Sequence, residues 1–288
     1  MNITVWLRAM RLQTLPVATS SLIVAVALMS KYAENQNLGI NTTATVLCFV
    51  FAILAQITSN FANEYYDFVR GGDKAGREGF RRGVAEGDIS PKAMKIATFV
   101  SIAIACAVGL CLVPTGGLLL IPLGLVIALA AFAYSAGPYP LSHHGLGEAA
   151  VIVFFGIVPV CMTFYLSFFT VTLEVMLASV ALGLISANVL IVNNYRDYAE
   201  DLASGKRTLA VVFGRKAYKY FYLANSIVAA LLLLPAIPYW LSACYVVASA
   251  TVFFAGLCRK EGKALNGILV ATSLTMLLFA IAILVESL

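Results

Sequence analysis

Long uninterrupted apolar runs dominate this chain and restrict the folds that it can adopt. Each run is close to the roughly 20 residues that an α-helix needs to cross a bilayer, and a helix satisfies its own backbone hydrogen bonds in lipid. Nine runs are predicted to be membrane spans: 15–30, 44–60, 96–113, 118–135, 149–169, 173–192, 218–236, 238–257 and 265–285. The sequence therefore predicts an all-α, polytopic bundle of nine transmembrane helices, formed by a single domain over residues 1–288.

The composition agrees with a membrane protein. Of the 288 residues, 61% are hydrophobic and 11% are charged, whereas a typical soluble domain has about a quarter charged residues. The first run has no A-x-A cleavage site after it and eight more runs follow, so we expect a permanent span rather than a signal peptide. The six cysteines lie in or beside apolar runs without C-x-x-C spacing, which is typical of small core residues.

Basic residues indicate how the predicted spans are oriented, because short cytoplasmic loops retain Lys and Arg. Seven basic residues lie within 70–95 and six within 196–219, and others precede the first and last spans. With nine crossings all of these share one face, and only Lys31 is left for the other. The N-terminus is therefore expected in the cytoplasm and the C-terminus outside. The net charge of +5 also suits anionic headgroups or an anionic substrate, and no nucleic-acid partner is expected.

Two polar segments stand out between the apolar runs. One follows the second predicted span and the other follows the sixth. Both begin with an Asn-x-x-x-Asp element, formed by Asn63 and Asp67 in the first copy and by Asn193 and Asp197 in the second. Four spans separate the copies, which indicates a parallel internal repeat.

The acidic residues of these segments predict a metal site. If each element continues the helix before it, residues i and i+4 share one face. The second copy extends this face to Asp201, whereas the next acid of the first copy is Asp73, beyond Gly71 and Gly72, where the helix is expected to end. Acids at a membrane boundary are costly unless they are paired or bound to a cation. Carboxylate and amide oxygens are ligands that magnesium takes. Zinc prefers His and Cys, and the chain has only two histidines, in another loop.

Basic residues near the acids are suited to complete a site for an anion. They are Arg70, Lys74 and Arg77 in the first segment and Arg196, Lys206 and Arg207 in the second. The alternative interpretation is that both segments are solvated loops, whose basic residues set the topology and whose acids balance that charge. The duplicated acidic pattern favours a site, whereas for any single basic residue the topological explanation is at least as good.

The two segments resemble the UbiA superfamily of intramembrane aromatic prenyltransferases, and most of all its menaquinone-pathway branch. The likeness rests on NFANEYYDFVRGGD at 60–73 and on NNYRDYAEDLASGKRTLAV at 193–211. Supporting pieces are RLQTLP at 11–16 and GLGE at 145–148. This chain departs from the family at Glu64, where an aspartate is usual.

The resemblance implies roles for individual residues. Magnesium would be bound by Asn63, Asp67, Asp197 and Asp201, with Asp73 as a further candidate, and the catalytic acids would be Asp67, Asp197 and Asp201. Contacts to diphosphate or acceptor would come from Arg11, Arg70, Lys74, Arg196 and Lys206. The family often has a basic residue near position 142, where this chain has Ser-His-His, and His143 or His144 is a candidate base toward the acceptor.

The reaction that the resemblance implies is magnesium-dependent transfer of a polyprenyl group from polyprenyl diphosphate to 1,4-dihydroxy-2-naphthoate, with loss of the carboxylate, giving demethylmenaquinone. The active site would face the cytoplasm from the cell membrane and open to membrane lipid. Within the enzyme class, the alternative is a related prenyltransferase acting on 4-hydroxybenzoate, homogentisate or another acceptor. An alternative of a different class is a transporter of divalent cations or organic anions, because acids inside a membrane bundle can mark an ion path.

Overall fold

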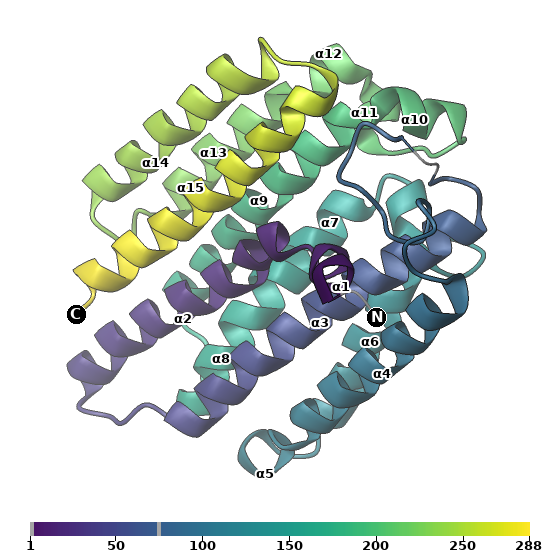
Figure 1. Ribbon diagram of the computed structural model, residues 1–288. Coiled ribbons are helices and arrows are strands. Elements are labelled where there is room, and N and C mark those ends of the chain that lie inside the picture. The colour runs from purple at the N-terminus through teal and green to yellow at the C-terminus, as the bar shows by residue number, and fades with distance from the viewer. Residues whose placement is uncertain (1–2, 74–75) are drawn as a thin grey trace.

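The computed structural model describes residues 3–73 and 76–288, and every regular element within these ranges is helical. The longer helices are α2 (Leu15–Gln36), α3 (Thr42–Val69), α4 (Pro91–Leu110), α6 (Leu120–Ser135), α8 (Val158–Phe168), α9 (Leu173–Arg196), α13 (Tyr220–Leu233), α14 (Tyr239–Val252) and α15 (Leu265–Glu286). The shorter α-helices are α1 (Ile3–Ala9), α5 (Val113–Gly116), α7 (Gly147–Val151), α10 (Tyr198–Ala203), α11 (Leu209–Phe213) and α12 (Arg215–Tyr218). Two π-helices are η3 (Ile152–Ile157) and η4 (Phe253–Leu257), and three 3₁₀ turns are η1 (Leu12–Thr14), η2 (Leu141–His143) and η5 (Gly262–Ala264). Figure 1 shows the long helices side by side in one bundle.

Seven helical stretches are long and apolar enough to cross a membrane. They are Ile3–Gln36, Thr42–Val69, Pro91–Leu110, Gly147–Phe168, Leu173–Arg196, Tyr239–Leu257 and Gly262–Glu286. The other two predicted spans, 118–135 and 218–236, correspond to α6 and α13, which have 16 and 14 residues, fewer than the roughly 20 of a full crossing. The all-helical bundle is therefore confirmed, while nine crossings and the sides of the termini stay predictions.

Local sequence explains where several helices begin. Asn41, Ser90 and Thr172 each accept a hydrogen bond from the backbone N–H three residues ahead, at the starts of α3, α4 and α9. Pro16 and Pro91 lie in the first turns of α2 and α4, where the missing N–H leaves no helical hydrogen bond unmade. These residues stop the apolar runs from joining into longer helices.

The helices pack closely around α9 in the interior. Gly183 of α9 lies so near η3 that a Cβ there would be 2.6 Å from the Ile152 carbonyl oxygen. Small residues at such crossings let backbones approach, as is common in membrane bundles. Polar side chains join the same helices, because Asn188 of α9 donates to the Ser226 hydroxyl of α13 at 2.9 Å. Packing and interhelical hydrogen bonds together hold the bundle.

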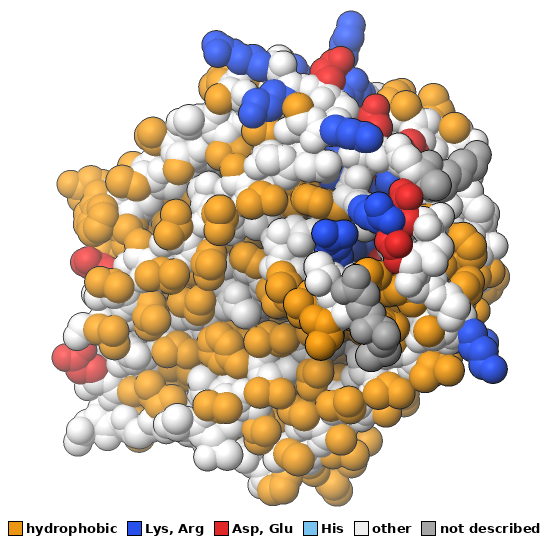
Figure 2. Space-filling view, viewed as in Figure 1, with side chains coloured by type: hydrophobic (Ala, Val, Ile, Leu, Met, Phe, Trp, Pro, Cys, Tyr) orange, Lys and Arg blue, Asp and Glu red, His pale blue; other side chains and the backbone are white. Residues whose placement is uncertain are grey.

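The surface divides into an apolar flank and a charged end. Figure 2 shows hydrophobic side chains over a broad flank, while Lys, Arg, Asp and Glu gather toward the end where α10, α12 and the loop after α3 lie in Figure 1. On α6, Leu125 and Leu129 are 60% and 59% exposed. Large apolar side chains exposed at this density suit lipid rather than water. The chain is therefore an integral membrane protein.

Candidate functional site

The first acidic element forms the last turns of α3. Asn63 and Asp67 both lie inside the helix, so they share the face that their spacing predicts. The helix ends soon after, and Gly71 follows with φ of 73°, a left-handed conformation that favours glycine. The backbone N–H of Gly72 then donates to the Asp67 carbonyl at 2.9 Å. This turn brings Asp73 back beside Asp67.

The second acidic element lies where α9 gives way to α10. Asp197 is the residue between the two helices. Its backbone N–H donates to the Asn193 carbonyl at 3.0 Å, and the N–H of Asp201 donates to the Asp197 carbonyl at 2.8 Å. The i, i+4 hydrogen bonds thus continue through the junction. All three side chains stay on one face, as their spacing predicts.

A cavity of about 500 Å³ lies between the two elements and extends into the apolar interior. Its polar end is lined by Asn63, Asp67, Asn193, Asp197, Asp201, Arg11, Arg77, Arg82 and Lys206. Its other walls include Cys48, Leu112 and Leu166. Cys48 and Asp67 both belong to α3, and at about 1.5 Å per residue they are roughly 28 Å apart along the helix. One chamber therefore joins a charged end to an aliphatic interior.

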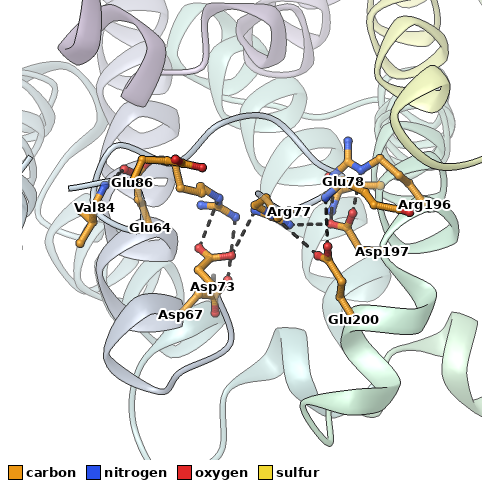
Figure 3. A network of polar contacts seen from close by, with 12 residues as sticks. Glu64, Asp67, Asp73, Arg77, Glu78, Val84, Glu86, Arg196, Asp197 and Glu200 are labelled. Atoms are coloured by element: carbon orange, nitrogen blue, oxygen red, sulfur yellow. Dashed lines mark hydrogen bonds and ion pairs between the residues drawn. The ribbon is translucent and has the colours of Figure 1, made fainter. Parts of the chain in front are cut away.

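Arg77 joins the two acidic elements, as Figure 3 shows. Its guanidinium lies 3.2 Å from the Asp73 carboxylate, 2.9 Å from that of Asp197 and 3.8 Å from that of Glu200. Burial lowers the pKa of Arg77, but the negative charges of Asp197, Asp73 and Glu200 outweigh this effect and raise the pKa overall. Arg77 therefore places a permanent positive charge between the two copies of the repeat.

Asp67 lies among three basic side chains. Its carboxylate is 3.4 Å from Lys206 Nζ, 3.5 Å from His143 Nε2 and 4.0 Å from Arg82 Nη2. Nevertheless Asp67 Oδ1 is buried without a hydrogen-bond partner in the described chain. His143 Nε2, 3.5 Å from this oxygen, is too far for a good hydrogen bond, whereas buried polar atoms are usually hydrogen-bonded. Such an atom fits a cation that takes oxygen ligands.

Burial also shifts the pKa values of acids outside the spans. It raises the pKa of Asp73 to about 6, although the charge of Arg77 opposes the shift. It raises the pKa of Asp201 to about 7, against the charge of Lys206. For Lys206 itself, burial lowers the pKa, but Asp67 and the other acids outweigh it and raise the pKa overall. Asp201 is therefore partly protonated near neutral pH, and a divalent cation bound to its carboxylate would displace that proton.

The acids are paired with basic side chains rather than gathered around one point. Among the described residues, no three His, Cys, Asp or Glu side chains are placed to hold one metal ion. The donors are nevertheless carboxylate and amide oxygens facing a cavity, which is the set that magnesium takes. The residues therefore fit the ion in chemical type. Bringing them together around it requires exchange of the ion pairs made by Arg77, Arg82 and Lys206.

Arg11 and Lys206, two of the predicted substrate contacts, line the cavity. Arg11 lies between α1 and η1 with φ of 52°, an unusual conformation for a residue with a side chain. Its Nη2 atom is buried and has no hydrogen-bond partner in the described chain. The side chain is therefore an unsatisfied donor at the cavity.

Arg196 and Arg70 are not among the described residues that line the cavity. Arg196 donates to the side-chain amide oxygen Oδ1 of Asn193 at 2.6 Å and to the Asp197 carboxylate at 2.7 Å, so it holds two side chains of the second acidic element. Arg70 donates to two backbone carbonyls at the end of α6 and so ties α3 to α6. Lys74, the remaining predicted contact, lies outside the described residues.

Arg82 is the site residue that the sequence did not single out. It lines the cavity and lies 3.3 Å from Asp73, yet positive-inside placement explained it fully as a topology signal. Glu64, where the chain departs from the family pattern, is buried and accepts a hydrogen bond from the backbone N–H of Val84 at 3.0 Å. It holds the loop after α3 and is not among the described lining residues.

Known proteins match this chain over most of its length. The model of the UbiA prenyltransferase family matches residues 20–264. The 1,4-dihydroxy-2-naphthoate octaprenyltransferase of Escherichia coli is 36% identical over 215 residues, which are 73% of this chain and 68% of that protein. The protein of the same name from Haemophilus influenzae is 35% identical over 224 residues, 76% of this chain and 71% of that one. The structure of a UbiA homolog from Archaeoglobus fulgidus bound to GPP and Mg2+ covers 98% of this chain and 99% of its own, with a TM-score of 0.64 at 16% identity.

Proposed function

The chain belongs to the UbiA prenyltransferase family and is a prenyltransferase, and from this we propose that it transfers a polyprenyl group from polyprenyl diphosphate to 1,4-dihydroxy-2-naphthoate. Loss of the acceptor carboxylate as carbon dioxide would give the quinol form of demethylmenaquinone. The cavity carries the proposal, because it joins a charged end to an apolar interior. A diphosphate with a long isoprenoid tail has the same division into a charged head and an apolar chain.

The acceptor assignment is supported by the relatives, which are named for that acceptor and share about a third of their residues with this chain. The runner-up within the class is another aromatic acid, such as 4-hydroxybenzoate or homogentisate. A transporter is not favoured, because the acids gather at one end of the cavity, whereas an ion path places them at successive depths.

We assign the metal to the two acidic elements. The ligands would be Asn63, Asp67, Asp197 and Asp201, with Asp73 as a further candidate. When bound, magnesium stabilises as a Lewis acid the negative charge that develops on the departing diphosphate. The catalytic contribution of Asp67, Asp197 and Asp201 would be to hold the metal ion at the cavity wall. A fold relative solved with GPP and Mg2+ supports this choice of ion.

The basic side chains at the cavity complete the diphosphate site. Lys206, Arg77 and Arg82 are positioned at the cavity by the acids that they contact, and when a metal ion takes those carboxylates the three cations would be free to meet phosphate oxygens. Arg11 adds the donor that has no partner in the described chain. Arg196 and Arg70 contribute indirectly. Arg196 holds the side chains of Asn193 and Asp197, and Arg70 holds two backbone carbonyls at the end of α6.

The apolar walls protect the reaction. An allylic carbocation is captured by water, and a chamber lined by aliphatic side chains excludes water from the reacting carbon. We place the site at the cytoplasmic face of the cell membrane, with residues 1–288 forming one domain that crosses nine times. The support for that face is the basic bias of the loops at the charged end.

The test is a membrane assay with 1,4-dihydroxy-2-naphthoate and a polyprenyl diphosphate, with and without magnesium, read by mass spectrometry. The expected product is a metal-dependent prenylated naphthoquinol that lacks the carboxylate. If folded protein makes no product from this acceptor but does from 4-hydroxybenzoate or homogentisate, the acceptor assignment is wrong. Inactivity with every acceptor would contradict the proposed reaction.

A further inference from the structure

A buried polar cluster beside the cavity has no part in the scheme above. It consists of Glu148 of α7, Asn194 of α9 and Tyr218 of α12. Asn194 Nδ2 donates to Glu148 Oε1 at 3.0 Å, and the Tyr218 hydroxyl donates to the same oxygen. Glu148 and Asn194 are each 8% exposed, and Tyr218 is fully buried. Burying a carboxyl group is costly even when it is hydrogen-bonded, so its place at the cavity needs an explanation.

The cluster sets the orientation of the Asn194 amide. Both contacts of the amide, to Glu148 and at 3.5 Å to the Tyr218 hydroxyl, are made by Nδ2. A carboxylate only accepts hydrogen bonds, so a flipped amide would set two acceptor oxygens against each other. Asn194 Oδ1 is therefore directed away from Glu148. No described residue donates a hydrogen bond to this oxygen, and Asn194 lines the cavity.

The adjoining wall suits an aromatic ring. Tyr134, Leu190 and Asn194 all line the cavity, and Leu190 precedes Asn194 by one helical turn. A Cβ on Gly147 would lie 3.2 Å from Leu190 and 3.4 Å from the Tyr134 hydroxyl, so these two side chains meet at the start of α7, next to Glu148. The wall is thus aromatic and aliphatic, with the Asn194 amide beside it.

This wall adjoins the charged end of the cavity. Asn194 directly follows Asn193 in the sequence, and Asp197 lies about one helical turn further along the chain. A ring packed on Leu190 with a hydroxyl at Asn194 would therefore lie beside the acidic elements. That is the position from which a ring can reach the carbon that leaves the diphosphate.

We propose that Asn194 accepts a hydrogen bond from a ring hydroxyl of the aromatic acceptor, and that Glu148 is a positioning residue that holds Asn194 in the required orientation. This inference rests on the proposed function. A hydroxyl that donates to a carbonyl oxygen keeps more electron density on its own oxygen and on the ring, which favours attack on an allylic carbon. A site built around such a bond also rejects analogues that lack the hydroxyl.

The experiment compares the full-length wild type with Asn194→Leu, which keeps the side-chain size and removes the carbonyl. The Asn194→Leu variant should raise the KM for 1,4-dihydroxy-2-naphthoate roughly tenfold, as expected for one lost hydrogen bond, and leave the KM for polyprenyl diphosphate unchanged. The inhibition constants of 1-hydroxy-2-naphthoate and 4-hydroxy-2-naphthoate, which each lack one hydroxyl, are measured for both proteins. One analogue should bind the wild type more weakly than the full acceptor does, and Asn194→Leu should lose that discrimination.

Two further variants separate positioning from folding. Glu148→Leu should raise the acceptor KM alone, and Glu148→Gln should recover most of that loss, because its amide oxygen can accept both hydrogen bonds. Asn188→Leu is the matched control. Asn188 is buried on the same helix but bonds to Ser226 and is not among the described lining residues, so its replacement should lower thermal stability without changing acceptor discrimination.

The outcomes are distinguishable. Discrimination between the analogues that survives in Asn194→Leu, or an equal rise in both KM values, would overturn the role of Asn194. Equal effects of Glu148→Gln and Glu148→Leu would overturn the positioning role of Glu148. Failure of the wild type to prenylate the naphthoate at all would overturn the proposed function and this inference with it.

Discussion

Arg77 donates to the Asp197 carboxylate at 2.9 Å, across 120 residues of sequence, and so ties the loop after α3 to the end of α9. The same guanidinium contacts Asp73. The loop lies close against its partners, since a Cβ on Gly79 would be 2.8 Å from Arg196 Nη2. One side chain therefore connects the two copies of the repeat and lines the charged end of the cavity.

Replacing Arg77 should weaken both stability and donor binding. Arg77→Met removes one of the two counter-charges of Asp73 and of Asp197, which keep Arg82 and Arg196, so the loss should be smaller than the roughly 3–5 kcal/mol for breaking a fully buried pair. The change also removes a cation from the diphosphate site. We expect a lower melting temperature and a donor kcat/KM reduced at least about tenfold. Arg81→Met is the control, because Arg81 pairs with Asp88 at the surface, with its side chain 53% exposed. A donor kcat/KM in Arg77→Met equal to that of Arg81→Met would contradict the assignment.

Neutralising either acidic element should abolish turnover without preventing membrane insertion. Asp67→Asn and Asp197→Asn keep the side-chain shape and remove the charge that we assign to the metal, so turnover should fall by about 100-fold or more. Steady-state turnover and the magnesium concentration for half activity are measured in purified protein. Asp88→Asn, in the exposed ion pair with Arg81, should behave as wild type. Normal turnover by either site variant would remove that acid from the catalytic set.

The metal-free protein should lose stability as the pH rises from about 4 to 7. Burial raises the pKa of Asp201 from 3.8 to about 7, so in this window the folded state binds a proton that the unfolded state has released, and the free energy of unfolding falls with pH. Asp73, whose pKa is raised to about 6, acts in the same direction over a narrower range. Melting temperatures in EDTA at several pH values check this. Asp201→Asn should flatten the dependence, and an unchanged slope would exclude Asp201 as its source.

Gly183 should not tolerate a side chain, whereas Gly267 should. In Gly183→Ala the new Cβ would lie 2.6 Å from a backbone oxygen of η3, and overpacking of this kind costs about 1–3 kcal/mol. Gly267 lies in α15 with nothing within 4 Å of an added Cβ, so Gly267→Ala should change stability by less than about 1 kcal/mol. Unfolding in a denaturing detergent compares the two variants. Equal stabilities would mean that α9 and η3 have room to separate.

The helical periodicity of the chain was sufficient to predict much of the site. Asn63 and Asp67 share a face because α3 continues through them, and Asp201 joins Asp197 because the backbone hydrogen bonds cross the end of α9. Each relation involves residues four apart, and local spacing determines it. The left-handed turn at Gly71 was likewise predictable from the paired glycines.

Long-range partners were not predictable in this way. Arg81 and Arg82 are neighbours in the same basic segment, yet Arg82 lines the cavity and Arg81 pairs with Asp88 at the surface. Positive-inside placement explains both residues equally, so the sequence offers no means of ranking them. The lengths of α6 and α13 were also missed, because hydropathy marks where a run is apolar and does not show where its helix ends.

The cavity holds charge at one end only, and this has a consequence for how the catalytic cycle finishes. In the proposed reaction both substrates arrive as anions, one with a diphosphate and the other with a carboxylate. The lipid product has lost both groups. The quinol therefore has no anionic group that Arg77, Arg82 or Lys206 could bind. Its apolar tail and uncharged ring favour the surrounding bilayer. Loss of carbon dioxide would also make the overall conversion run one way.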